Sequence, residues 1–263
     1  MIVNSIETSN PIPFDSTTCG SDAYARGSGQ KIVGFSFFGD IELEERIKKR
    51  YFAGIADNLR LMPVYYPGWV MRLYFDLART DPVLKMFCDL ACSDNNLDIC
   101  YERELPGTPM IDASKVFPMN WRFFPTLDPQ VILKYIKRKS TQLRIKRSFS
   151  AIIASKKQTF KVDIIISRDL DSRFDDREQA AVNEWIRSEK SFHIMRDHPQ
   201  HRASTLGGLW GSKLFNQDIR DRWKKSWPSG FQDPILWKER TVKDPDQEFL
   251  GRQKIYLILL LIN

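Results

Sequence analysis

Cysteine and histidine, the residues that most often hold structural metal ions, are scarce in this chain of 263 residues. It contains four cysteines and three histidines, and the cysteines do not form the paired C-x-x-C units that are typical of a zinc site. Cys88 and Cys92 are spaced one helical turn apart, a pattern that favours free thiols buried in a core. The cysteines therefore argue against a structural zinc ion and leave the redox compartment open.

Long apolar runs and a cationic leader are also missing. The first 30 residues contain no basic start followed by an apolar core, so the sequence predicts neither a signal peptide nor an N-terminal anchor. The C-terminal run IYLILLLIN is apolar but too short to span a bilayer. We therefore expect no membrane span, and the location stays unknown, with the cytoplasm as the default.

Acidic residues are absent from one segment, 132–161, which carries ten lysines and arginines. Subtracting these ten charges from the net charge of +7 leaves −3, so the rest of the chain is mildly acidic. Ten like charges cannot be buried in a core, and we expect this basic insertion to be a surface excursion. It could bind nucleic acid or an anionic surface, but its aromatic residues are few, and nucleic acid is the less favoured partner.

What the chain does have is an alternation of apolar strands with amphipathic helices. The patterns predict strands at 31–40, 69–77, 96–102, 162–166 and 192–197, and helices at 41–62, 81–92, 116–128 and after Asp175. The stretch LGGLWGSK at 206–213 is interpreted as a glycine-rich loop that opens a further helical region. This alternation predicts an α/β fold with a mostly parallel, Rossmann-like central sheet and helices on both faces.

The same patterns predict the domain organisation. Residues 1–30 are polar and rich in Ser, Thr, Gly and Pro, and we expect them to be disordered. A single α/β domain is expected over 31–250, interrupted by the basic insertion at 132–161. The helical and strand patterns are lost after Gly251, so 251–263 is expected to be an aberrant tail.

Two carboxylates follow the most apolar of the predicted strands. The run VDIIIS, which is typical of a strand buried on both faces, leads directly into Asp169 and Asp171. In open α/β sheets, ligands bind beyond the carboxyl ends of the strands. Side chains two residues apart in an extended segment lean to the same side, so these carboxylates can share one Mn²⁺ or Mg²⁺ ion. The alternative is a solvated turn, neutralised by Arg168 and Arg173.

The scarce histidines gather shortly after this pair, in FHIMRDHPQH. Imidazole can bind metal or move protons near neutral pH, and Asp197 or His198 is our candidate for a general base. The run GGLWG begins at Gly207 and Gly208, where a backbone can approach a ligand closely. Trp210 is either a stacking platform for a sugar ring or a buried anchor.

Several blocks of the sequence together resemble a known family. They are FPMNWRFFPTLDPQV, DIIISRDLDSRFDDREQAAVNEWIRSEKSFHIMRDHPQH, LGGLWGSK and DPDQEFL. They are similar to the ordered blocks of glycosyltransferase-like proteins with a GT-A type nucleotide-diphospho-sugar transferase domain, seen in capsular-polysaccharide loci and in animal genomes. The likeness is extensive over 162–250 and weaker over 31–131.

The resemblance implies a nucleotide-diphosphate sugar donor and a glycan or other hydroxyl acceptor. It implies that Asp169 and Asp171 bind the divalent ion that holds the donor diphosphate. The residues that it places at the donor or in the sugar and acceptor pocket are Arg122, Arg168, Gly207, Gly208 and Trp210.

The chain departs from the family pattern at two places. In the family, LDPQV leads almost directly into DIIISRD, so 132–161 is an insertion, and the DQEFL block leads into a further metal or diphosphate contact, whereas here GRQKIYLILLLIN follows. Three functions therefore stay open: a metal-dependent glycosyltransferase of the hexosyltransferase type, weakly active or inactive in this form; a catalytically dead relative that acts as an interaction protein; and a nucleic-acid or anionic-surface binder.

Overall fold

The computed structural model describes residues 19–38, 45–78, 80–101, 116–128, 130–131, 159–160, 162–196, 198–199, 205–231 and 245–252. Among these residues, no helix is long and apolar enough to cross a membrane.

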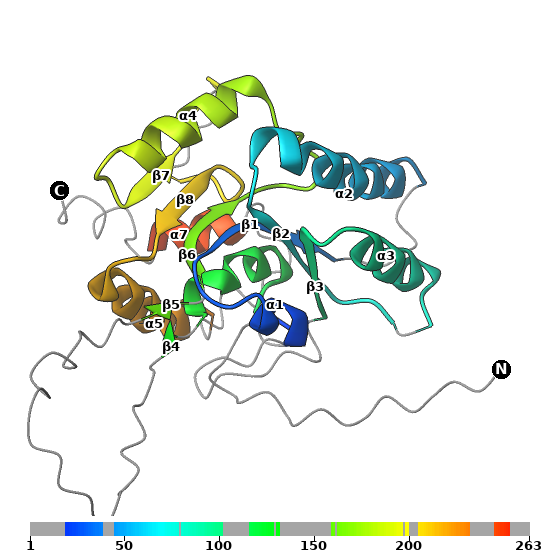
Figure 1. Ribbon diagram of the computed structural model, residues 1–263, viewed down its shortest axis with the longest axis horizontal. Helices are drawn as coiled ribbons and strands as arrows, with labels where there is room; N and C mark the ends of the chain where they lie inside the picture. Colours follow the sequence, from blue (N-terminus) through cyan, green and yellow to red (C-terminus); the bar gives the residue numbers. More distant parts are fainter. Residues whose placement is uncertain are drawn as a thin grey trace, which may run out of the picture.

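A six-stranded mixed sheet forms the centre of the fold (Figure 1). Its strands, in spatial order, are β3 (Leu97–Tyr101), β2 (Val70–Phe75), β1 (Gln30–Phe37), β6 (Val162–Ser167), β8 (Trp210–Lys213) and β7 (Phe192–Ile194). The first four strands pair in parallel, β8 pairs antiparallel to β6, and β7 pairs antiparallel to β8. A separate antiparallel pair joins β4 (Gln130–Val131) to β5 (Thr159–Phe160). The expected α/β class with a mostly parallel sheet is confirmed.

Helices cover both faces of this sheet, as expected (Figure 1). One face carries α2 (Glu45–Tyr65), α3 (Pro82–Ser93) and α4 (Asp176–Arg187). The other carries α1 (Ser21–Ala25), the 3-10 helix η3 (Pro118–Leu127), α5 (Gln217–Phe231) and α7 (Pro245–Arg252). Successive side chains of a strand point to opposite faces, and Ile32 and Val33 of β1 accordingly enter different cores. The sheet is therefore buried between two apolar layers.

The local signals read from the sequence act as expected at α4. Asp175 caps this helix, and its side chain accepts a hydrogen bond from the Glu178 backbone N–H at 2.8 Å. Val182 and Trp185 then turn to the core at helical spacing. The cap fixes where the chain leaves the carboxylate turn after β6 and enters α4.

The order of the strands creates a switch point between β1 and β6. The chain first winds outward from β1 through β2 to β3, and later returns to place β6 on the other side of β1. Crossovers on the two sides of such a point diverge, and the carboxyl ends of the two strands are left flanking a crevice. The turn after β6, which contains Asp169 and Asp171, lies at this point.

The stretch 206–213 corrects one expectation. It was predicted to be a loop that opens a helix, but its last four residues, Trp210–Lys213, are the strand β8, and α5 begins only at Gln217. The glycine-rich sequence obscures the strand pattern, but β8 is buried along its whole length and pairs with both β6 and β7. Pairing satisfies its backbone groups, which a buried loop could not do.

The N-terminal segment corrects another. Residues 1–30 were expected to be disordered, but residues 19–30 form α1 and the start of β1, while 1–18 lie outside the described residues. The expected basic insertion at 132–161 also lies outside them except for Thr159 and Phe160, and its surface position stays a prediction. Helix α7 continues to Arg252, slightly beyond the expected domain end.

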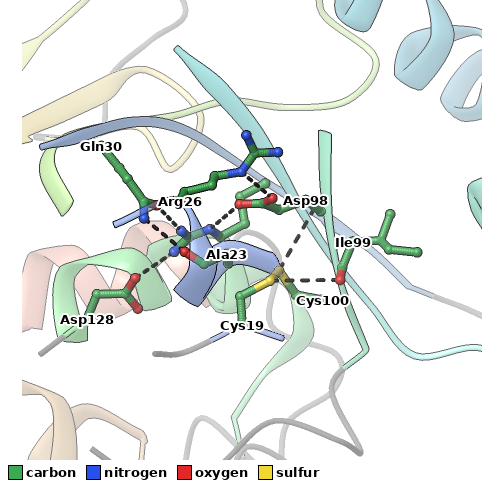
Figure 2. The surroundings of a disulfide bond; sticks show 9 residues. Cys19, Ala23, Arg26, Gln30, Asp98, Ile99, Cys100 and Asp128 are labelled. Carbon is green, nitrogen blue, oxygen red and sulfur yellow. Dashed lines mark hydrogen bonds and ion pairs between the residues drawn. A yellow bond between two sulfur atoms is a disulfide. The ribbon is translucent and has the colours of Figure 1, made fainter. Parts of the chain in front are cut away.

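The exposure and pairing of the cysteines differ from what the sequence predicted. Cys88 and Cys92 are exposed free thiols, because α3 turns Phe87 and not the cysteine face toward the sheet. Cys19 and Cys100 form a disulfide whose Cα atoms are 4.9 Å apart. Figure 2 shows this bond where α1 meets β3. It joins the segment that was expected to be disordered to the edge strand of the sheet.

Candidate functional site

The two carboxylates lie where the sequence predicts, at the carboxyl end of β6. The Arg168 backbone N–H donates to the Gly34 carbonyl at 3.1 Å, which ties the end of β6 to β1. Beyond it the Ser172 N–H donates to the Asp169 carbonyl at 3.2 Å and closes a turn. The Asp169 side chain is 43% exposed and that of Asp171 is 24% exposed, so solvent and ligands can reach both.

A buried arginine, Arg122, binds the Asp169 carboxylate from the interior of the protein. Arg122, on η3, is fully enclosed, and its guanidinium donates to Oδ1 of Asp169 and to Oδ2 of Asp246. The same group donates to the Arg168 carbonyl at 3.2 Å. Asp246, near the start of α7, is itself buried. One guanidinium therefore joins three separate elements and leaves one of its two carboxylate partners open to solvent.

The charges of this cluster act on the two carboxyl groups in opposite directions. Burial alone would raise the pKa of Asp169, but the Arg122 guanidinium outweighs it, with help from Arg168, and the pKa falls below its usual value. Burial raises the pKa of Asp246, Arg122 opposes the rise, and the Asp169 charge adds to it. Asp169 is therefore the member of the pair that is firmly ionised and available as an anionic ligand.

The glycines of GGLWG pack against these carboxylates. A Cβ on Gly207 would lie 1.5 Å from the Asp246 Oδ2, and a Cβ on Gly208 would lie 2.1 Å from the Asp169 Oδ2. The Gly207 carbonyl accepts a hydrogen bond from the Ser167 hydroxyl at 2.6 Å, which fixes the loop to the end of β6. The glycines were expected to let the backbone approach a ligand closely, and the close approach that the structure shows is instead to Asp169 and Asp246.

Helix α2 lies along the turn that carries Asp169 and Asp171. A Cβ on Gly54 would lie 1.8 Å from the Leu170 carbonyl oxygen, so only glycine lets the helix come this close. The Asn58 amide donates to the Ser172 carbonyl at 2.9 Å, and Arg173 forms an ion pair with Asp57 at 3.0 Å. The turn is therefore held by the helix on one side and by the end of β6 on the other.

Asp171 has its own arginine partner, also from α2. Arg50 Nη2 lies 2.7 Å from Asp171 Oδ2. Burial raises the pKa of the neighbouring Tyr51, and the charges of Asp171 and Asp169 raise it further against the opposing effect of Arg50. The Tyr51 hydroxyl is thus within the field of both carboxylates, which places Asp169 and Asp171 around one region of the surface.

A metal ion at this position would have few protein ligands. The described part of the chain contains no group of three or more His, Cys, Asp or Glu side chains that could hold one. Mg²⁺ is usually bound through one or two carboxylates together with substrate phosphates, and the exposed carboxylates of Asp169 and Asp171 fit that mode. The condition is that Arg50, whose side chain is 66% exposed, leaves Asp171.

All five expected donor-binding residues are buried, and the side chains of Arg122, Arg168 and Trp210 are turned into the protein. Arg168 is buried, forms an ion pair with Glu178 at 2.7 Å and donates to the Gly208 carbonyl at 3.4 Å. Trp210 is 3% exposed and packs on Trp223, with ring centroids 5.2 Å apart. Of the two interpretations of Trp210, the buried anchor is therefore correct, because β8 is buried on both faces. Arg168 supports the site from within.

The histidine block contributes little to the cluster among the described residues. His193 stacks on Trp185, with ring centroids 5.4 Å apart, and burial lowers its pKa to about 4. His198 is exposed. Asp197 and His201 lie outside the described residues, so the role of Asp197 as a general base stays a prediction.

Sequence reasoning missed three residues that shape the site: Asp246, Arg50 and Gly54. Asp246 had a signal, since the DPDQEFL block was singled out without a role for this carboxylate. Gly54 also had a signal, since a glycine inside a helical pattern costs stability relative to alanine and is a candidate for a close packing contact. Arg50 had no signal in the sequence, because its partner, Asp171, lies 121 positions further along the chain.

No family model matches the chain, and neither do curated proteins or solved structures.

Proposed function

We propose that this chain is a metal-dependent glycosyltransferase of GT-A type that binds a nucleotide-diphosphate sugar at the turn after β6. The observation that carries the proposal is the position of Asp169, an ionised and half-exposed carboxylate at the switch point between β1 and β6. The strand order β3-β2-β1-β6 supports it, because Rossmann-like sheets bind nucleotides at such a point. The likeness of the sequence blocks to this class supports it as well.

The chain's own residues would act on the donor by position and charge. Arg122 keeps Asp169 ionised and fixes its carboxylate against Gly208. Asp169 and Asp171 would hold Mn²⁺ or Mg²⁺, and the bound ion supplies charge neutralisation for the departing nucleoside diphosphate. Gly207 and Gly208 would support the site from within, since they let the loop pack directly against the Asp246 and Asp169 carboxylates, where a Cβ would collide. Asp197 or His198 would take the proton of the acceptor hydroxyl in an inverting reaction.

Binding of the donor can be tested without knowledge of the acceptor. Wild-type protein would be melted with a panel of nucleotide-diphosphate sugars, each with and without Mn²⁺. A donor that binds only the folded protein raises the melting temperature by mass action, and we expect at least one to do so only in the presence of Mn²⁺. Asp169→Asn and Asp171→Asn should abolish this metal-dependent shift while the proteins stay folded.

The matched control is Asp89→Asn, which removes an exposed carboxylate of α3 that pairs with Lys85 on the same helix. This variant should keep the full shift. The proposal is wrong if no donor in the panel gives a shift that depends on metal, or if Asp89→Asn reduces the shift as much as Asp169→Asn does.

One observation favours the second candidate, a catalytically inactive relative that serves as an interaction protein. Both carboxylates already have arginine partners, Arg122 for Asp169 and Arg50 for Asp171. A pair neutralised in this way needs no metal ion. The melting experiment separates the two candidates, because the inactive relative predicts no response to Mn²⁺ with any donor.

A further inference from the structure

The ion pair between Arg50 and Asp171 belongs to a continuous contact between α2 and the carboxylate turn. Gly54, Asp57 and Asn58 follow Arg50 by four, seven and eight positions, so the four residues share one face of the helix. Three of them touch the turn at its backbone or at Arg173. Arg50 is the member of this stripe that reaches the exposed carboxylate, and its place beside the site is therefore built into the packing of α2.

We propose that Arg50 is the diphosphate-binding residue of the site: it pairs with Asp171 as the structure shows, and it moves to the donor phosphates when a divalent cation binds Asp171. This inference rests on the proposed function. It assigns a role to a residue outside the blocks that resemble the glycosyltransferase-like family.

The charges and exposures of the pair explain why Arg50 can exchange partners. Its side chain is 66% exposed, and exposed ion pairs contribute little stability, so its release from Asp171 costs little. Arg122 is different, because its side chain is 4% exposed and it holds a second, buried carboxylate, Asp246. Of the two arginines that pair with the turn, Arg50 is therefore the one whose guanidinium can move to another partner, because a movement of Arg122 would leave the buried charge of Asp246 unpaired.

The chemistry of the diphosphate explains where Arg50 would go. Oxygen ligands lie about 2.1 Å from Mg²⁺, so a phosphate on the ion that Asp171 binds would come within a few ångströms of the guanidinium. A guanidinium presents a rigid fork of donors that matches phosphate oxygens. Arg50 would therefore pass from the Asp171 carboxylate to the phosphate oxygens.

The test is isothermal titration of two ligands into three proteins. The ligands are Mn²⁺ alone, and a nucleoside diphosphate such as UDP or GDP in saturating Mn²⁺. The proteins are wild type, Arg50→Gln, and the control Arg60→Gln, which changes another exposed arginine of α2 whose partner is Asp57 at 3.9 Å. In Arg50→Gln, Mn²⁺ alone should bind at least threefold more tightly, because its competitor is gone, while the nucleoside diphosphate should bind about tenfold more weakly.

These opposite shifts distinguish the possible outcomes. If wild type binds Mn²⁺ and the nucleoside diphosphate but Arg50→Gln behaves like Arg60→Gln, the role of Arg50 is overturned and the proposed function stands. If Arg50→Gln weakens both ligands, Arg50 merely supports Asp171, and the exchange is overturned as well. If wild type binds neither ligand, the proposed function fails, and the role of Arg50 fails with it.

A second inference comes from the disulfide, and it is independent of the site. Cys19 and Cys100 are both buried, at 0% and 1% exposure, and 81 positions separate them. Figure 2 shows the bond beside Asp98, which forms an ion pair with Arg26 at 2.7 Å. Gln30 donates to the carbonyls of Ala23 and Gly27 at 2.9 and 2.7 Å. The segment 19–29 is therefore fastened to the sheet by a covalent bond, an ion pair and hydrogen bonds.

We infer that the chain matures in an oxidising compartment, where Cys19 and Cys100 are joined and Cys88 and Cys92 stay free. Structural disulfides form and persist in such compartments and are rare in the cytosol. In the step itself, the two thiols lose two protons and two electrons to the disulfide of an oxidoreductase or of oxidised glutathione, which is reduced to two thiols. This inference replaces the cytoplasm as the expected location.

Thiol mapping tests the pairing directly. Protein made in an oxidising compartment and purified without reductant would be denatured, alkylated, digested and analysed by mass spectrometry. Cys88 and Cys92 should carry the label, and Cys19 and Cys100 should appear as one linked peptide. Four labelled cysteines would overturn the inference.

Stability measurements test the role of the bond. The double variant Cys19→Ser with Cys100→Ser should melt about 5–15 °C below wild type, and its amides at 19–30 should lose protection from hydrogen exchange. The control, Cys88→Ser with Cys92→Ser, should melt within about 2 °C of wild type, because both side chains are exposed. Equal melting temperatures for the two double variants would show that the bond does not fasten the segment.

Discussion

The protein contains two networks in which one arginine pairs with two aspartates. One network includes Arg72 of β2, and the other lies at the carboxyl end of β6; they differ in how far their side chains are exposed to solvent. In the first, Arg72 lies between Asp98 and Asp128, at 3.5 and 2.8 Å, and all three side chains are at most 1% exposed. In the second, Arg122 lies between Asp169 and Asp246, and the Asp169 side chain is 43% exposed. The Arg72 network is sealed from solvent, whereas the Arg122 network opens to solvent at the turn after β6.

The difference teaches what each network can do. A buried ion pair seldom adds stability over apolar packing, but the loss of one partner is costly because the other charge stays buried. The sealed network therefore constrains the fold and has no access to ligands. The open network has one carboxylate that can change partners without leaving a buried charge uncompensated, and this is the property that a binding site needs.

The largest expected effect is in the sealed network. Arg72→Met should lower the free energy of unfolding by about 3–5 kcal/mol, because Asp128 and Asp98 would lose their shared cation inside the core. Denaturation in urea measures the loss, and Arg60→Met, at an exposed position of α2, should change stability by about 0.5 kcal/mol or less. A loss below about 1 kcal/mol for Arg72→Met would erase the contrast between the two networks.

A smaller effect is expected where the open network meets the GGLWG loop. Gly208→Ala places a Cβ 2.1 Å from the Asp169 Oδ2, so either the loop or the carboxylate must shift. We expect a loss of about 1–3 kcal/mol in the free energy of unfolding, together with weaker Mn²⁺ binding. Gly251→Ala is the matched control, since its Cβ would meet nothing within 4 Å and alanine favours the helix α7. Unchanged Mn²⁺ affinity in Gly208→Ala would separate the loop from the site.

A pH titration of stability includes a contribution from His193, which belongs to neither network. Measuring this contribution separately sharpens the comparison between the two networks. Burial lowers the folded-state pKa of His193 to about 4, whereas the unfolded imidazole titrates near pH 6.5. The unfolded chain therefore binds more protons between these values, and stability falls as the pH drops from 6.5 toward 4. The loss between pH 7 and pH 5 should be about 2 kcal/mol at most, and His193→Phe should abolish it. Acid sensitivity that persists above pH 4 in His193→Phe would assign it to other groups.

The smallest expected effect is that of Asp169→Asn at neutral pH, about 1 kcal/mol or less. Its side chain is half exposed, asparagine keeps an acceptor for Arg122, and Arg122 keeps Asp246. The lowered pKa of Asp169 means that the stability due to its charge is present above the unfolded pKa and is lost as pH falls through the folded value. Asp98→Asn, in the sealed network, should cost clearly more. Equal costs in urea denaturation would show that the two networks do not differ.

The sequence predicted the elements of the fold well because their signals are local. The apolar run before Asp169 and the capping pair Asp175 and Glu178 each lie within a few residues, and each is found where expected. The strand β8 was missed for the opposite reason. The three glycines of LGGLWGSK suggested a loop, and the reason that Trp210–Lys213 is a strand lies in its neighbours β6 and β7, which are distant in the chain.

The candidate site divides in the same way. That Asp169 and Asp171 stand at a strand end follows from the sequence, because the apolar run ends at Ile166, just before them, and the carboxyl end of a strand is a local feature. The contacts that join these two residues to the rest of the protein do not follow from the sequence. Asp169 lies 47 positions from Arg122, and Arg122 lies 124 positions from Asp246. Whether Trp210 is a platform or a core residue was likewise left open until β8 was seen to be buried on both faces.

By itself, the sequence determined that this protein is an α/β domain with an acidic turn after its most apolar strand, because backbone periodicity and capping act over a few residues. The tertiary structure decided which charges meet: Arg122 with Asp169 and Asp246, Arg50 with Asp171, and Arg72 with Asp98 and Asp128. It also decided that Cys19 pairs with Cys100 while Cys88 and Cys92 do not pair. Ion pairs and disulfides depend on distance in space, and that distance is fixed only when the sheet brings the ends of β1, β2, β3 and β6 together.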